Sequence, residues 1–128
     1  LDIPISSQVV LFSRTSLQRD LVSPENPRAM YFDDNVYVAW MPGGKIEVNS
    51  FDPEAGGLFY FEEPPKETGD EVGFIRERRC MGCHAGSATN FLSGPLGRSH
   101  YTTDSGRRLR AVPSHERISH RIPFNERW

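Results

Sequence analysis

The amino-acid sequence predicts a loop-rich α+β domain, in which a small antiparallel β meander forms the N-terminal half and short helices follow it. Three observations support this fold class. The chain has 128 residues, the size of one domain with its own core, so we expect a single domain over residues 1–128. Ten prolines and eleven glycines are spread along it, which leaves no room for long helices. In the first half, segments rich in aromatic and β-branched residues alternate with turn sequences.

Turn chemistry separates the expected strands. The strands cover residues 8–12, two segments within 29–41, residues 46–51 and residues 58–63. The turns between them are Asp-Asp-Asn at 33–35, Pro-Gly-Gly at 42–44 and "DPEAGG" at 52–57. Residues 46–51 alternate apolar and polar side chains, as a half-buried strand does. These segments together predict a meander of three or four strands, with residues 8–12 as an additional strand.

Regular structure is expected to be sparse after this meander. The polar loop "EEPPKETGDE" at 62–71 contains two prolines, and residues 71–79 are expected to form one or two helical turns. Glycine and proline recur from residue 91 onward. A region so poor in regular elements needs something else to pack around, and a prosthetic group would serve.

Both cysteines of the chain lie in the pentapeptide Cys80-Met81-Gly82-Cys83-His84. The pattern C-x-x-C-H is typical of covalent haem attachment. Two intervening residues let both thiols reach one edge of a porphyrin, and the adjacent imidazole lies under the iron as proximal ligand. The motif therefore predicts one haem c, held by Cys80 and Cys83, with His84 as an iron ligand. The short helices of the second half are then expected to wrap this haem.

Two other chemistries use the same residue types. Cys80 and Cys83 could form a zinc site with His115 and His120, since both pairs have spacings that zinc sites use. However, 31 residues separate the pairs, against about 12 to 15 in the zinc-finger pattern. A dithiol exchange site would need a strand-then-helix context, which these cysteines lack. The pentapeptide is also short enough to arise by chance, yet its specificity favours haem.

Four stretches of the chain carry a wider resemblance. They are "SSQVVLFSRTSLQ" at 6–18, "PRAMYFDDNVYVAW" at 27–40, "CMGCH" at 80–84 and "SHRIPFNERW" at 119–128. With them the chain resembles a family of uncharacterised bacterial monohaem c-type cytochrome domains. The resemblance implies an exported, periplasmic protein, and it implies a fragment of a longer polypeptide, because the family's sequences continue beyond the last stretch. The chain departs from small class I cytochromes, in which the motif lies near the N-terminus and a Met ligand follows it.

The resemblance brings no established reaction with it. A covalently attached haem favours single-electron transfer with a redox partner protein, so we expect an electron carrier rather than an enzyme. Two alternatives stay open at this point. One is a haem-based sensor or gas-binding domain of a larger protein, and the other is a small haem peroxidase, which needs an open iron and a distal acid-base group.

The second axial ligand of the iron has several candidates. They are His120, Met30, Met41, His100 and His115, or no protein ligand at all. We favour His120, because it lies in the basic and partly apolar segment "RISHRIPF". Arg28 and Arg98 are candidates for binding the haem propionates, since guanidinium groups pair with carboxylates through two hydrogen bonds.

Charge is distributed unevenly along the chain, although the formal net charge is only -2. Residues 52–71 carry seven acidic side chains and one lysine, whereas residues 104–128 carry six arginines and three acidic side chains. Such asymmetry favours an electrostatic docking surface for a partner protein. An isoelectric point near 6.1 argues against nucleic-acid binding, and no apolar segment is long enough to cross a bilayer.

Overall fold

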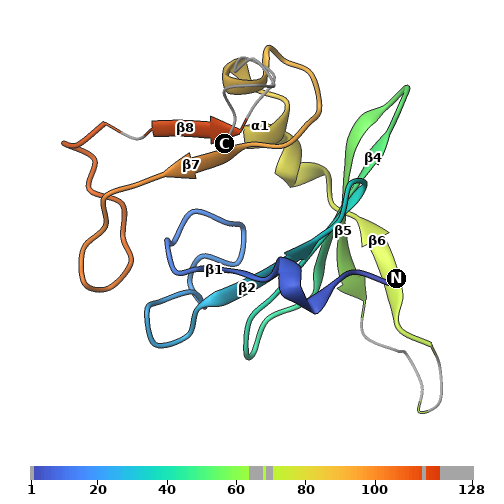
Figure 1. Ribbon diagram of the computed structural model, residues 1–128, viewed down its shortest axis with the longest axis horizontal. Coiled ribbons are helices and arrows are strands. Elements are labelled where there is room, and N and C mark those ends of the chain that lie inside the picture. The colour runs from blue at the N-terminus through green and yellow to red at the C-terminus, as the bar shows by residue number, and fades with distance from the viewer. Residues whose placement is uncertain (1, 64–67, 69–70, 114, 119–128) are drawn as a thin grey trace.

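The computed structural model describes residues 2–63, 68, 71–113 and 115–118, and it consists mainly of antiparallel β-sheet (Figure 1). The strands are β1 (Val9–Leu11), β2 (Arg28–Phe32), β3 (Val36–Trp40), β4 (Glu47–Asp52), β5 (Gly56–Glu63), β6 (Gly73–Arg76), β7 (Gly97–Ser99) and β8 (His115–Ile118). The helices are η1 (Ile5–Ser7), η2 (Arg78–Cys80), α1 (Met81–His84) and η3 (Ser87–Thr89), of which only α1 is an α-helix.

The first six strands form one sheet in the order in which they occur along the chain. Each pairs antiparallel with the next, so the sheet is a simple meander. Aspartate side chains stabilise two of its turns. Asp33 accepts hydrogen bonds from the backbone amides of Asn35 and Val36 at 2.8 and 2.7 Å. Asp52 accepts them from the backbone amides of Glu54 and Ala55 at 2.9 and 2.7 Å. Gly43 and Gly56 have φ values of 77° and 73°, which glycine adopts without strain.

One face of this sheet is buried. Cross-strand partners share a face, and the register joins Ala39 to Glu47 and Glu47 to Phe61. Phe59, two residues from Phe61, also belongs to this face, as does Met41, two residues beyond Ala39. The four apolar members are the most buried side chains of the sheet and its ends, and Met41 is 0% exposed. We call this side of the sheet the inner face.

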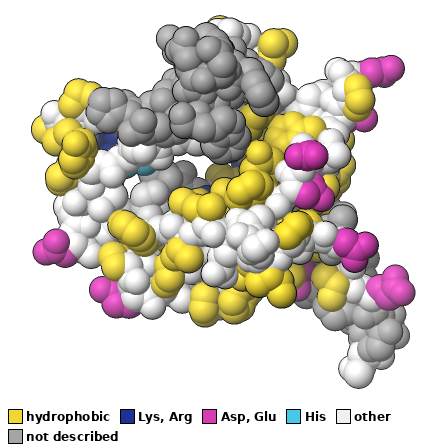
Figure 2. Space-filling view, viewed as in Figure 1, with side chains coloured by type: hydrophobic (Ala, Val, Ile, Leu, Met, Phe, Trp, Pro, Cys, Tyr) yellow, Lys and Arg dark blue, Asp and Glu magenta, His cyan; other side chains and the backbone are white. Residues whose placement is uncertain are grey.

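The strands β7 and β8 form a separate two-stranded sheet, with a register shift between Gly97 and Arg98. Figure 1 shows this pair as a second layer, with α1 near one of its ends and the six-stranded sheet on the other side of the view. In Figure 2 the molecule is hollowed at the centre of the same view, and apolar side chains border the hollow.

The polypeptide covers its apolar side chains incompletely. Large apolar side chains in the second half are strongly exposed, among them Phe91 at 75%, Leu92 at 61% and Tyr101 at 59%. Apolar surface therefore remains that a bound group or another segment can cover.

The structure confirms the strands expected in the first half but corrects the predicted fold class. The prediction of an α+β domain with a helical, haem-wrapping second half was wrong. The described residues form a β-rich domain whose sheet has six strands, and their one α-helix has four residues. The clearest error concerns residues 73–76, which pair with β5 as β6 instead of forming a helix. An open sheet edge offers partners on β5 to alternate backbone groups of this segment, which outweighs its weak helical tendency.

Candidate functional site

The two cysteines lie on a short helical turn that follows the last strand of the main sheet. Helix η2 continues directly into α1, and Glu77 caps η2 by accepting hydrogen bonds from the backbone amide and the guanidinium of Arg79, both at 2.9 Å. Residues three apart share one side of a helical turn, so Cys80 and Cys83 lie on the same side. Both thiols are free, with Cys80 partly buried and Cys83 exposed.

The ring of His84 has a defined tautomer and a defined orientation. Its Nδ1 lies 3.0 Å from the backbone oxygen of Gly94. Because a carbonyl oxygen only accepts hydrogen bonds, Nδ1 carries the proton, and Nε2 keeps its lone pair. The ring also packs against Phe59 of the inner face, with 4.5 Å between ring centroids. Burial lowers the pKa of His84, which favours the neutral imidazole that binds metals.

Glycines in the turn between β4 and β5 position this hydrogen bond. Gly57 N donates to the backbone oxygen of Ser93 at 3.0 Å, and Ser93 Oγ donates to the backbone oxygen of Gly57. Gly94 N in turn donates to the backbone oxygen of His84 at 3.0 Å. A Cβ atom at Gly57 would stand 3.2 Å from Gly94 Cα, so any larger residue would push the two backbones apart by a few tenths of an ångström. The sheet thereby aims the carbonyl that fixes the imidazole.

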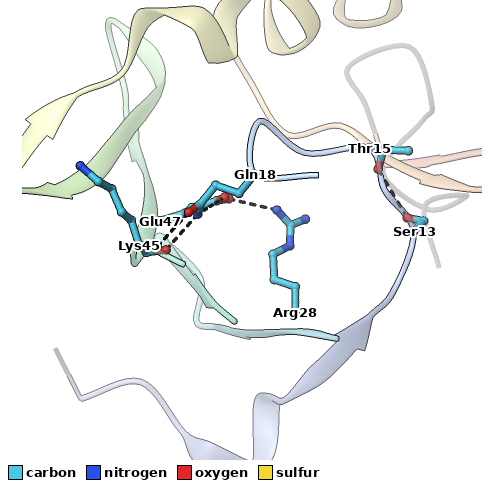
Figure 3. Close-up of polar contacts among 6 residues, drawn as sticks. All are labelled: Ser13, Thr15, Gln18, Arg28, Lys45 and Glu47. Carbon is cyan, nitrogen blue, oxygen red and sulfur yellow. Dashed lines mark hydrogen bonds and ion pairs between the residues drawn. The ribbon is translucent and has the colours of Figure 1, made fainter. Parts of the chain in front are cut away.

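A half-buried charge network lies on the inner face beside the motif (Figure 3). Glu47 of β4 receives Arg28 Nη1 at 3.0 Å on one oxygen and Gln18 Nε2 at 2.8 Å on the other. The side chains of Arg28 and Glu47 are each 18% exposed. Gln18 comes from the loop after β1, where it also bonds both backbone groups of Lys45 at 2.9 and 2.8 Å. The network therefore ties this loop to the sheet.

The network acts electrostatically on the motif. Burial, followed by the charges of Glu47 and Glu77, raises the pKa of the Cys80 thiol to about 11. Cys80 is therefore protonated at neutral pH, whereas dithiol exchange needs a thiolate. Arg28 and Glu47 act on His84 with opposite signs, Arg28 lowering and Glu47 raising its pKa.

A shallow pocket opens next to the motif. Its volume is about 370 Å³, and it is lined by Phe59, Arg76, Glu77, Arg78 and Met81. Phe59, which packs on His84, also forms its apolar wall. An apolar wall with a charged rim suits a group that is itself part apolar and part anionic.

The structure brings some of the predicted site residues together and separates others. Cys80, His84 and Arg28 lie close enough to share the charge network, and Cys83 lies on the same turn. Arg98 lies on β7 in the second sheet, where its charge acts on His100 rather than on His84.

The candidate second ligands have different surroundings. Met30 lies on the inner face within β2, and Met41 is packed against the turn that contains Gly44. His100 follows β7 and is half-buried. His120 and the side chain of His115 lie outside the described residues.

Several residues of the site were missed in the sequence. Phe59, Gly57 and the Ser93-Gly94 dipeptide position His84, and Glu47 with Gln18 forms the charge network. The Gly-Gly pair at 56–57 and the Ser-Gly pair at 93–94 were visible as turn signals, but nothing in either stretch shows that the two turns meet. Glu47 was read only as the polar side of a strand.

The donor set fits a covalently attached haem. It offers two unpaired thiols on one side of a turn and a neutral imidazole with a free Nε2, beside apolar surface that the chain leaves uncovered. Among residues 2–63, 68, 71–113 and 115–118, no three or more His, Cys, Asp or Glu side chains gather as they would around a metal ion. The zinc alternative depends on His115 and His120, whose side chains lie outside this part of the chain.

Comparison of the chain with protein-family models, curated proteins and solved structures finds no match. Within the described residues, no helix has the length and apolar character that crossing a membrane requires.

Proposed function

We propose that the chain is a monohaem c-type cytochrome module that exchanges single electrons with a partner protein. Cys80 and Cys83 would hold the haem through thioether bonds, and His84 Nε2 would bind its iron. The bound haem supplies an iron that alternates between the ferric and ferrous states. One observation carries the proposal: within a C-x-x-C-H motif, Gly94 fixes the tautomer of His84 that leaves Nε2 free.

Three further features support this function. The raised pKa of Cys80 disfavours a redox dithiol. The exposed apolar side chains of the second half leave uncovered surface for a large planar group. Arg28, beside His84, is a half-buried cation of the kind that binds propionates. With its resemblance to monohaem c-type domains, the chain is proposed to be periplasmic, where a redox partner protein supplies or accepts the electron.

The experiment is optical. The chain is expressed with machinery that attaches haem c, purified, and examined as the alkaline pyridine haemochrome. We expect one haem per chain with the spectrum of a thioether-linked haem, resistant to acid-acetone extraction. The variant Cys80→Ala/Cys83→Ala should lose the covalent haem, whereas Gly82→Ala should keep it, because a Cβ at that position meets nothing within 4 Å. A colourless wild-type protein would overturn the proposal.

A further inference from the structure

His100 has a buried ring nitrogen with no partner. Its Nδ1 is covered from solvent and makes no hydrogen bond within the described structure. Leaving such a group unpaired forfeits the hydrogen bond it makes in water, so native structures normally provide a partner. A ring nitrogen that is covered in this way is either bonded to something outside the described residues or held at a net cost.

The chain connects His100 directly to the residue that fixes His84. Gly94, which accepts the His84 hydrogen bond, precedes His100 by six residues, and β7 makes up the last three residues before His100. Six residues of extended chain reach about 20 Å. That reach is enough to carry a second imidazole from the proximal side of a macrocycle, around its edge, to the distal side.

The charges around His100 suit a neutral ligand near anionic groups. Burial, then Arg108 and Arg98, lowers the pKa of His100. The lowered pKa favours the neutral ring, which is the form that binds metals. The same two guanidinium groups supply positive charge to which propionate carboxylates would be attracted.

The methionine candidates have weaker positions. Met41 is fully buried, and its Sδ lies 3.1 Å from where a Cβ on Gly44 would stand, so its side chain already fills the core beneath that turn. Met30 stands between Val9 and Ala39 in the ladder, where an apolar side chain needs no ligand role to be explained.

On this basis, and resting on the proposed function, we infer that His100 is the second axial ligand, so that the iron is bound by two imidazoles. Two histidines close the iron to exogenous ligands and give a lower reduction potential than a histidine-methionine pair. This assignment favours electron transfer over gas sensing or peroxide chemistry, which need an open or labile position.

The test compares His100→Ala with three controls in the haem-loaded protein. The controls are His115→Ala, His120→Ala and the adjacent Tyr101→Ala, whose side chain is 59% exposed. We expect the wild type and all three controls to be low-spin and inert to carbon monoxide. His100→Ala should become high-spin and bind carbon monoxide completely, while its pyridine haemochrome still reports one covalent haem.

A conservative variant gives an independent readout. His100→Met should restore a low-spin iron with the weak red-end absorption band of thioether ligation and a raised reduction potential. The inference is overturned if His100→Ala stays low-spin and inert to carbon monoxide, or if the wild type itself binds carbon monoxide at once. Absence of haem from the wild type would instead refute the proposed function, so the two failures are distinguishable.

Discussion

The two halves of the chain are held together in different ways. In residues 28–63 every strand has an antiparallel neighbour on each side, and the buried side chains of the inner face belong to the same segment. In residues 77–113 the helices have three or four residues, and Phe91 and Leu92 are more than half exposed. The first half therefore carries its own stabilising contacts. The second half depends on its contact with the β4–β5 turn and, under the proposed function, on the group it binds.

Removing the covalent attachment should produce the largest difference in amide exchange between the two halves. In Cys80→Ala/Cys83→Ala, amides in residues 78–113 should exchange about 100-fold faster than in the haem-bound protein, because loss of a tight ligand removes about 2.7 kcal/mol or more. Amides in residues 28–63 should change far less. Hydrogen exchange followed by mass spectrometry measures both regions in one experiment, and equal acceleration in both would show that the halves unfold together.

The contact between the halves can be broken at Gly56. Its φ is 73°, and a Cβ there would meet the backbone oxygen of Ser93. Gly56→Ala should reduce the free energy of unfolding by about 2–4 kcal/mol, since backbone strain and displacement of Ser93 add. Urea denaturation of the haem-free and haem-bound proteins measures this.

Gly43→Ala is the matched control for that substitution. Gly43 has a similar φ of 77°, but a Cβ at this position meets nothing within 4 Å. It should cost only the strain of the left-handed conformation, about 1–2 kcal/mol. Equal losses at the two positions would show that the approach of Ser93 contributes nothing.

The charge network, which joins the loop after β1 to the sheet beside the motif, should contribute less to the free energy of unfolding. Arg28→Ala should cost about 1–3 kcal/mol, because it leaves the half-buried carboxylate of Glu47 without its cation. Arg14→Ala removes a comparable ion pair whose Asp20 side chain is 86% exposed, so its ion-pair contribution should be below about 1 kcal/mol. Thermal unfolding of both variants tests whether the more buried ion pair stabilises the protein more. A larger loss of stability in Arg14→Ala than in Arg28→Ala would contradict this.

The smallest expected effect is the pH dependence of the turn that presents Cys80. Hydrogen bonds from Arg79 lower the pKa of Glu77 from 4.5 to about 2. Because the folded-state pKa is depressed, the stabilisation is fully present above pH 4.5 and is lost as the pH falls toward 2. The protection factor of the amides at residues 78–80, which compares their exchange with that of an unstructured peptide at the same pH, should fall in the wild type as the pH is lowered through this window. In Glu77→Gln it should be flat, and a wild type that is also flat would contradict the assignment.

The sequence by itself determined the strands of the first half and the grouping of Cys80, Cys83 and His84 on which the proposed function rests. Side-chain alternation and turn residues such as Asp33 and Asp52 act locally, so their effect on the backbone can be read without knowing the fold. The spacing of Cys80, Cys83 and His84 is likewise a local property, which is why these three residues were predicted together.

Only the tertiary structure decided how that motif is held. Residues 73–76 became a strand because β5 offered an unpaired edge, which a local propensity cannot report. Gly94 accepts the His84 hydrogen bond because two glycines almost forty residues earlier let the backbones approach. Arg28 and Glu47 reach the motif through sheet register, and His100 has its covered nitrogen only after β7 is placed. These contacts join residues far apart in the chain, so their free energy depends on packing that no local pattern encodes.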